Sequence, residues 1–140
     1  MITALVCLGS NAPRKSAAVA EAFAFLARLG TVAADSGDFL SAPEQTPADA
    51  APYLNRIVAL ECGLPLEKLH ALTKGYETAV RGSYTGEGVA VDIDIVYYSG
   101  RCLRPRDAAS DYFLRGLELA KITAAAPLTA NFNLLIYGLR

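Results

Sequence analysis

The sequence predicts an α+β fold, a two-layer sandwich in which an antiparallel sheet carries its helices on one face. Two observations support this prediction. The chain has 140 residues, 53% of them hydrophobic, which is enough to bury one compact core. Short β-branched runs alternate with longer segments whose apolar residues recur at helical spacing. We therefore expect one domain over residues 1–140.

The first segments are predicted to be a strand, a helix and a strand. Residues 2–8 are apolar and lead into Gly9-Ser10-Asn11, a turn whose polar side chains would cap the next helix rather than contact a ligand. Over residues 17–29, apolar side chains recur at helical spacing and a glycine follows, which indicates a helix and its end. Residues 31–40 are expected to form a more polar strand that is irregular around Gly37.

The alternation continues after a long loop. Three prolines place residues 41–52 in a surface loop, and residues 54–62 alternate as a third strand. The later predictions are a helix over 66–80, a glycine-rich turn at 82–88, a fourth strand, a helix over 108–121 and an extra strand at 133–137. The first six elements run strand, helix, strand, strand, helix, strand, which is the split βαβ or ferredoxin-like arrangement.

Composition argues against several functional classes. The net charge is −1 and the basic residues are not clustered, so we expect no nucleic-acid partner. The longest apolar runs, about six residues, are far shorter than the roughly 20 of a membrane span, and no leader pattern precedes them. We therefore expect a soluble, cytoplasmic protein without a membrane partner. The sequence leaves the oligomeric state open.

The cysteines and the single histidine do not form a metal motif. Cys7, Cys62 and Cys102 are widely separated, each beside aliphatic residues. His70 is the one histidine and lies on a predicted helix. Buried reduced thiols and a surface histidine are therefore expected, and zinc is not.

Two aspartates stand two residues apart in the apolar run 91–96. Because a strand repeats every two residues, Asp92 and Asp94 would project from one face, and Val91, Ile93 and Ile95 from the other. Two like charges roughly 7 Å apart favour a cation between them. Carboxylates without accompanying His or Cys favour magnesium. The alternative is a half-buried strand whose outer face is only solvated.

A second pair shares a face on the third predicted strand. Tyr53 and Asn55 are also two residues apart, so an aromatic ring and an amide would point the same way. A ring can stack on a planar heterocycle while an amide offers both a donor and an acceptor to its edge. The loop 41–52 is long enough to cover such a site. Ordinary packing is the alternative for each residue taken alone.

An ordered set of short motifs adds to these observations. They are L-G-S-N at 8–11, A-P at 42–43, P-Y-L-N at 52–55, Glu77 near the end of the second predicted helix, and V-D-I-D-I at 91–95. Each is short, but the set in this order is much more specific than any member. Over about residues 1–120, the chain resembles the hydroxymethyl-dihydropterin pyrophosphokinases of folate synthesis.

The resemblance implies magnesium-dependent transfer of a pyrophosphoryl group from ATP to the hydroxymethyl group of a reduced pterin, leaving AMP. Two Mg²⁺ ions would be held by Asp92 and Asp94. Tyr53 would stack on the pterin and Asn55 would hydrogen-bond to its edge. The other implied residues are Ala42 and Pro43 in the substrate pocket, Tyr112 or Phe113 as a second aromatic wall, and Glu77 on the ATP side.

The chain departs from the family pattern near the phosphates. A W-G-P-R-like segment is expected before the acid pair, but residues 84–90 read Y-T-G-E-G-V-A. A P-H motif is expected downstream, and Arg106 stands where histidine is common. Arg104 and Arg106 are the candidate catalytic replacements, and Arg81 is a candidate on the ATP side. The tail from residue 122 onward also differs from the pattern, which limits the pyrophosphokinase-like core to about 1–121.

Two alternatives follow from these departures. The scaffold could act as a binding module, which either keeps a pterin or nucleotide pocket without turnover or uses its sheet face for self-association. It could also transfer a pyrophosphoryl or nucleotidyl group to another heterocyclic alcohol. The scaffold alone does not choose among these functions, because it hosts many of them.

Overall fold

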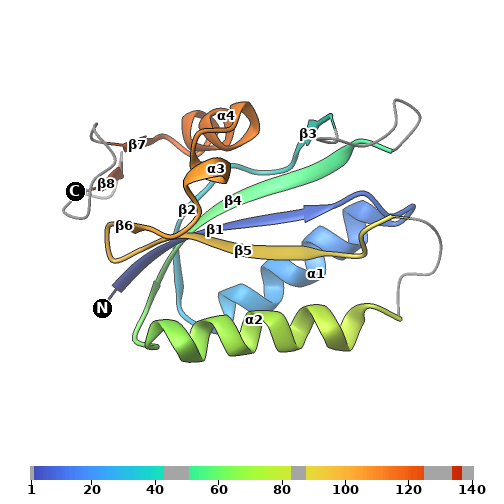
Figure 1. Cartoon of the computed structure of the whole chain (residues 1–140), viewed down its shortest axis with the longest axis horizontal. Helices are drawn as coiled ribbons and strands as arrows, with labels where there is room; N and C mark the ends of the chain where they lie inside the picture. Colours follow the sequence, from blue (N-terminus) through green and yellow to red (C-terminus); the bar gives the residue numbers. More distant parts are fainter. Residues whose placement is uncertain (1, 43–50, 83–87, 125–133, 137–140) are drawn as a thin grey trace.

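A twisted antiparallel sheet forms the centre of the molecule (Figure 1). The structure is a computed structural model that describes residues 2–42, 51–82, 88–124 and 134–136. The strand order is β2-β4-β1-β5-β6, and β3 also pairs with β4. The strands are β1 (Ile2–Ser10), β2 (Thr31–Asp35), β3 (Phe39–Ser41), β4 (Tyr53–Cys62), β5 (Asp92–Tyr98) and β6 (Arg101–Cys102). This order confirms the predicted ferredoxin-like α+β sandwich.

Helices cover the two faces of the sheet unequally. The helices are α1 (Lys15–Ala27), α2 (Leu66–Val80), α3 (Pro105–Ala108) and α4 (Asp111–Leu119). The two long helices, α1 and α2, lie together on one face as predicted, while α3 and α4 lie over the other (Figure 1). Every residue of β1 from Ala4 to Ser10 is buried, so both faces of this central strand need a cover. The face opposite the long helices is therefore open only where α3 and α4 leave it uncovered.

Alternation along β1 divides the core into two clusters. Val6 and Leu8 pack toward α1 and α2, with Val58 of β4 and Ile93 of β5. Leu5 points the other way, into a cluster that also contains side chains of α4. This division of neighbouring residues between two faces is the period-2 pattern of a strand.

The second predicted strand, residues 31–40, is divided into β2 and β3. The irregularity expected around Gly37 is present, because this residue has φ +71°. Its backbone N–H donates to the Asp35 carboxylate at 2.9 Å, which closes a local turn. Both pieces still pair with β4.

The third predicted helix, residues 108–121, also differs in its bounds. Helical structure begins earlier, at Pro105, and is broken between α3 and α4. Ser110 is extended (φ −75°, ψ 150°) and caps α4 by accepting a hydrogen bond from Phe113 N at 3.4 Å. The extra strand predicted at 133–137 is confirmed as β8 (Leu134–Ile136), which pairs with β7 (Ile122–Ala124).

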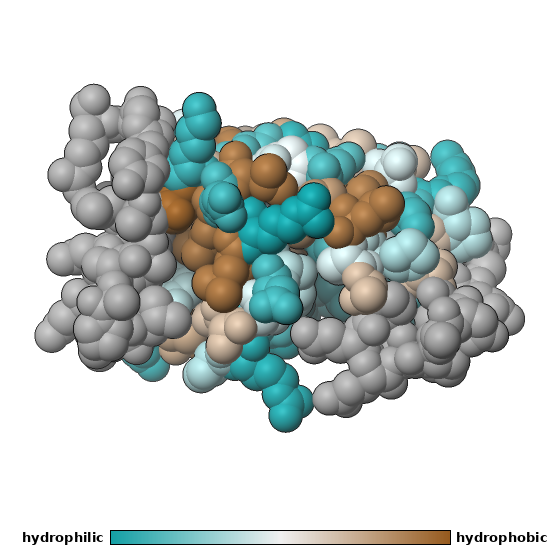
Figure 2. All heavy atoms as spheres, turned by 90° about the horizontal axis from the view of Figure 1, so that it is seen from above, coloured by the Kyte–Doolittle hydropathy of each residue, from teal (hydrophilic) through white to brown (hydrophobic). Residues whose placement is uncertain are grey.

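Apolar areas on the face that carries α4 are interrupted by hydrophilic ones. Figure 2 looks onto this face, where a band of hydrophilic side chains separates two apolar areas. Among the described residues, the exposed large apolar side chains are Leu40 of β3 and Leu114 and Leu119 of α4. Single exposed residues of this kind are normal on a protein surface. Among the described residues, no helix combines the length and the apolar character that crossing a membrane requires.

The cysteines carry free thiols. Cys7 and Cys62 are buried as predicted, whereas Cys102 is half-buried at the short β6. His70 is exposed on α2, in agreement with the prediction of a surface residue.

Candidate active site

The two aspartates of β5 share one face of the sheet. Val91, Ile93 and Ile95 belong to the core beneath α1 and α2, so Asp92 and Asp94 project from the opposite face. In the pairing with β1, Asp92 lies opposite Gly9 and Asp94 opposite Cys7. The predicted separation of the acidic and apolar side chains is therefore confirmed.

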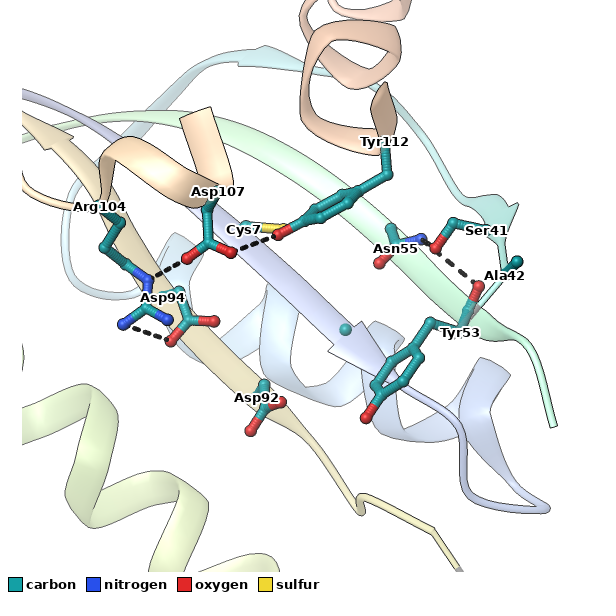
Figure 3. A pocket seen from close by; sticks show the side chains of 11 residues that line it. Cys7, Ser41, Ala42, Tyr53, Asn55, Asp92, Asp94, Arg104, Asp107 and Tyr112 are labelled. Carbon is teal, nitrogen blue, oxygen red and sulfur yellow. Dashed lines mark hydrogen bonds and ion pairs between the residues drawn. The ribbon is translucent and has the colours of Figure 1, made fainter. Parts of the chain in front are cut away.

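The aspartates lie in a pocket of about 240 Å³ on this face. Strands β1, β4 and β5 form its floor, and residues from β3, α3 and α4 form its walls. The lining residues are Cys7, Gly9, Ser41, Ala42, Tyr53, Asn55, Asp92, Asp94, Arg104, Asp107 and Tyr112. Figure 3 shows the rings of Tyr53 and Tyr112 on opposite sides of the hollow. The acids of β5 and the amide of Asn55 lie at its two ends.

Asn55 presents its carbonyl oxygen to the pocket. Its side-chain nitrogen donates to Ser41 Oγ at 2.6 Å, and the backbone carbonyls of Tyr53 and Phe39 lie 3.4 and 3.5 Å from the same nitrogen. Backbone carbonyls can only accept, so they fix which end of the amide is the nitrogen. Gly9 is opposite Asn55 in the sheet. A Cβ on Gly9 would lie 3.4 Å from Asn55 Oδ1, so glycine keeps this part of the floor open.

The acidic end of the pocket is only partly neutralised. Asp94 has two cations nearby, Lys74 Nζ at 3.4 Å and Arg104 Nη1 at 3.6 Å. No cation among the described residues forms an ion pair with Asp92. Burial, followed by repulsion from Asp94 and Glu77, raises the pKa of Asp92 to about 6. The site therefore holds a carboxylate that gains from an added cation.

Side chains of α2 satisfy the free edge of β5 between the two aspartates. Ile93 N donates to Glu77 Oε2 at 2.6 Å, and Lys74 Nζ donates to Ile93 O at 2.9 Å. Lys74 and Glu77 also form an ion pair at 2.9 Å. The α2 side chains thus give the backbone N–H and C=O of Ile93 the hydrogen bonds that a neighbouring strand would provide. These contacts hold the backbone between Asp92 and Asp94 in place.

The turn after β1 has a different role from the predicted one. The cap residue of α1 is Arg14, and no side chain caps that helix. Instead, Ser10 Oγ donates to Val89 O at 3.1 Å, and Asn11 Oδ1 accepts from Val89 N at 2.5 Å. The prediction of a helix cap at Gly9-Ser10-Asn11 is therefore wrong. The turn fixes the chain just before β5, and it was missed because its partner is 78 residues away in the sequence.

Two further cavities adjoin the aspartates. One, of about 440 Å³, lies beside α2 and is lined in part by Leu66, Lys74, Leu103 and Arg104, and it reaches Asp94. The other, of about 310 Å³, is lined by Glu77, Arg81, residues 88–91 and Asp92. Each aspartate therefore lies between the pocket with the tyrosines and a second cavity.

A family model described as 7,8-dihydro-6-hydroxymethylpterin-pyrophosphokinase (HPPK) matches residues 5–125. The chain belongs to this family. A search of the curated proteins gave no match. The matched segment contains α1 to α4 and the main sheet except the first residues of β1, so every described residue of the pocket lies inside it.

Most residues that the sequence suggested for the HPPK site lie in or beside the pocket. Ala42, Tyr53, Asn55, Asp92, Asp94, Arg104 and Tyr112 line it, and Glu77 and Arg81 line the cavity next to Asp92. Phe113 does not, because it is fully buried in the core and stacks with Tyr97 at a centroid distance of 6.1 Å. Arg106 is exposed on α3 and is not among the lining residues. Pro43 lies outside the described residues.

Five residues of the site were missed from the sequence. Lys74 and Asp107 look like charges on solvated helices, and Cys7 looks like a core residue. Gly9 and Ser41, which also line the pocket, look like residues of a turn and a loop. A weak signal existed for the first two, because each has a partner of opposite charge three residues away: Lys74 with Glu77, and Asp107 with Arg104. The spacing did not indicate that the basic residue of each pair, Lys74 or Arg104, also lies within ion-pair distance of Asp94.

The donor set agrees with the metal of the HPPK family. Among the described residues there is no group of three or more His, Cys, Asp or Glu side chains placed to hold an ion. Two carboxylates are nevertheless what Mg²⁺ commonly takes from a protein, because waters and substrate phosphates complete its octahedral shell. Asp92 and Asp94, two carboxylates on one face of a rigid strand, fit this pattern.

Proposed function

We propose that this chain transfers the pyrophosphoryl group of ATP to the hydroxymethyl group of 6-hydroxymethyl-7,8-dihydropterin, with Mg²⁺ held by Asp92 and Asp94. The observation that carries the proposal is the position of the two aspartates. They stand between a pocket flanked by aromatic rings and two cavities, one lined in part by Lys74 and Arg104 and the other by Arg81. Such a junction is where a ring-bearing alcohol and a polyphosphate would meet. A cytoplasmic location is part of the proposal.

The pterin is assigned to the pocket between Tyr53 and Tyr112. Two aromatic side chains on opposite sides of a hollow favour a flat ring stacked between them. Asn55 Oδ1 is the acceptor that the protein leaves for an N–H group on the ring edge. Ala42 lines the pocket, and Pro43, the next residue in the sequence, is assigned to the substrate site with it.

The nucleotide is assigned to the cavities beside α2. Glu77 and Arg81 lie on one side of the acid pair, and Lys74 and Arg104 on the other. Arg104 is the better candidate for a phosphate contact, because it lies beside Asp94 and lines both the pocket and the adjoining cavity, whereas Arg106 lines neither. Neutralising phosphate charge is the main requirement for this class of transfer.

In the proposed reaction, the hydroxymethyl oxygen attacks the β-phosphorus of ATP and loses its proton. The bond between this phosphorus and the oxygen that bridges to the α-phosphate breaks, and AMP leaves. Mg²⁺, when bound, offsets the charge on the phosphate oxygens. The protein holds the ring between Tyr53 and Tyr112, orients its edge with Asn55 and places Arg104 beside the phosphates. Bringing the two reactants into line in this way supplies a large part of the rate enhancement.

Formation of AMP tests this proposal directly. The protein is incubated with ATP, MgCl₂ and 6-hydroxymethyl-7,8-dihydropterin, and AMP is separated and quantified. The wild-type chain should form AMP, and a variant with both Asp92→Ala and Asp94→Ala should not. Asp111→Ala is the matched control, because Asp111 is exposed on α4 and does not line the pocket. Wild-type AMP formation no faster than that of the double variant would refute the transfer.

One observation favours the alternative of a binding module. Lys74 and Arg104 already lie within ion-pair distance of Asp94, and positive charge at a carboxylate competes with a metal ion. In this alternative, the chain binds the pterin and the nucleotide but does not join them. Calorimetric binding of both ligands together with no AMP would support the module over the enzyme.

A further inference from the structure

One carboxylate links the two halves of the pocket. Asp107 of α3 accepts a hydrogen bond from Arg104 Nε on one oxygen and from the Tyr112 hydroxyl, at 3.2 Å, on the other. Arg104 reaches onward to Asp94 at 3.6 Å. Figure 3 shows this chain of contacts from β5 to α4 along one side of the hollow.

The direction of each hydrogen bond to Asp107 follows from which groups can donate and which can accept. Arg104 has only donors, and a carboxylate has only acceptors. The Tyr112 hydroxyl is also a donor here, since burial, followed by the nearby Cys7 and Asp107, raises the pKa of Tyr112 and keeps its proton in place. Asp107 thus accepts hydrogen bonds from two donors that come from different parts of the site.

The backbone around Asp107 is held independently of its side chain. Ser110 donates twice to the Asp107 carbonyl oxygen, from N at 3.0 Å and from Oγ at 2.6 Å. These bonds fix the junction between α3 and α4, and the Ser110 cap then starts α4. Removing the Asp107 carboxylate would therefore leave the junction in place while freeing Arg104 and Tyr112.

We propose that Asp107 is a positioning residue that sets both the aromatic wall at Tyr112 and the guanidinium of Arg104. The inference rests on the proposed function, in that Tyr112 would contact the pterin and Arg104 the phosphates. Asp107 also lines the pocket, but in this assignment it acts on the two ligands through Tyr112 and Arg104. It restricts the Tyr112 ring to the orientation that faces Tyr53, and it holds Arg104 beside Asp94 instead of in solvent.

Ligand affinities of four variants test the inference in the whole chain. Calorimetry measures Kd for 6-hydroxymethyl-7,8-dihydropterin and, separately, for α,β-methylene ATP with MgCl₂. Tyr112→Phe keeps the ring but removes its hydroxyl, and should weaken pterin binding alone by about five- to tenfold, the effect of one hydrogen bond. Arg104→Met should weaken nucleotide binding alone. Asp107→Ala should weaken both, and the matched Asp111→Ala neither.

A double variant separates positioning from general loosening of the fold. If Asp107 acts on the pterin through Tyr112, the variant with both Asp107→Ala and Tyr112→Phe should bind the pterin within about twofold of either single variant. A purely structural role would give additive losses, or a lower Tm with unchanged affinities, and either result would overturn the inference. Asp107→Asn supplies a second variant that keeps one acceptor, and it should give a smaller loss for one ligand only.

AMP formation is measured apart from these affinities. Wild-type protein that binds both ligands and forms no AMP would refute the proposed transfer and leave the role of Asp107 to be decided by the affinities. Asp107→Ala protein whose two affinities equal those of the wild type would refute the positioning role even where AMP is formed. Wild-type protein that binds neither ligand would refute both.

Discussion

The hydroxyl oxygen of Ser41 lies 2.6 Å from the side-chain nitrogen of Asn55. Ser41 is on β3 and Asn55 on β4, where their backbones run side by side. This contact uses the donor end of the amide and leaves its carbonyl oxygen facing the pocket. A ligand at this position must therefore offer an N–H group, which a pterin has on its ring edge.

Replacing Asn55 by Leu should weaken pterin binding by about tenfold, since one hydrogen bond from the ring edge is lost. Ser41→Ala should have a smaller effect, of about two- to threefold, because the carbonyls of Phe39 and Tyr53 still orient the amide. The measurement is pterin Kd by calorimetry, with the Kd of α,β-methylene ATP as the control that should not change. Equal losses for the two variants would show that the amide is not oriented as described.

Gly9 is a second position in the pocket floor where a substitution should change pterin affinity. It lies opposite Asn55 on one side and Asp92 on the other. Its φ is not in the left-handed region, so alanine is compatible with the backbone, but the new Cβ would lie 3.4 Å from Asn55 Oδ1 and 3.6 Å from the Tyr53 ring. These are ordinary van der Waals distances, so Gly9→Ala should change the Tm little. Because the new methyl group occupies space at the pocket floor that the ring would need, it should raise the pterin Kd by about tenfold.

Cys7→Ala is the comparison for this variant, because it alters the same strand and the same pocket by removing atoms rather than adding them. It should lower stability, since Cys7 is 5% exposed within the core cluster beneath α4. Pterin affinity should fall less than in Gly9→Ala. A Gly9→Ala protein that binds the pterin like the wild type would place the ring away from this part of the floor.

Asp92 should lower the stability of the metal-free protein at neutral pH. Its pKa of about 6 in the folded state exceeds the ordinary value of 3.8, so folding favours the protonated form. Stability is then lost as the pH rises from about 4 to about 6 and stays low above that range. Asp92→Asn should raise the free energy of unfolding at pH 7.5 by about 1 to 2 kcal/mol, allowing for solvent screening, while AMP formation disappears.

The measurement is urea unfolding in EDTA at pH 7.5 and at pH 4. The difference in free energy of unfolding between Asp92→Asn and the wild type should be smaller at pH 4 than at pH 7.5. Asp94→Asn is the matched control on the same strand. Asp94 has Lys74 and Arg104 as partners, so its replacement removes attractive contacts and should give no gain at pH 7.5. A loss of stability in Asp92→Asn at pH 7.5 would contradict the burial of an unpaired carboxylate.

Local alternation was enough to predict which side chains share a face. Asp92 and Asp94 are separated from Ile93 because a half-buried strand has period 2, and Tyr53 and Asn55 share a face for the same reason. That these two pairs face one pocket depends on register. Gly9 is the common neighbour of Asn55 and Asp92, and pairing between distant segments is not encoded in the spacing within any one of them.

The helical contributions were harder to predict. The break at Ser110 sets the phase of α4, which turns Tyr112 toward the pocket and Phe113 into the core. A single helix over 108–121 leaves both choices open. Lys74 and Asp107 reach the site only because α2 lies along the free edge of β5 and α3 lies beside Arg104. Such contacts depend on tertiary packing, which a charged helix surface does not reveal.

An ion pair on the other face of the sheet should control the acid stability of the fold. Arg56 binds Asp35 through two hydrogen bonds, Nε to Oδ1 at 2.8 Å and Nη2 to Oδ2 at 2.5 Å. Its guanidinium also stacks 3.6 Å above the centre of the Phe23 ring. Burial alone would raise the pKa of Asp35, but hydrogen bonds from Arg56 and from Gly37 N outweigh it and lower the pKa below its ordinary value.

A carboxylate with a lowered pKa contributes stability that is complete above its ordinary pKa of 3.8. This stability is lost as the pH falls through the lower folded value. Asp35→Asn should therefore be less stable than the wild type at pH 7, by about 1 kcal/mol for this partly exposed pair, and the difference should shrink toward pH 2.5. Arg56→Lys keeps the charge but loses the two-pronged geometry and the stacking, so it should also be destabilised. Urea unfolding across this pH range measures the free energy of unfolding of both variants.

Pterin affinity is the control, and it should be unchanged in either variant because neither side chain lines the pocket. If the difference in free energy of unfolding between Asp35→Asn and the wild type does not vary with pH, the effect is due to packing and not to charge.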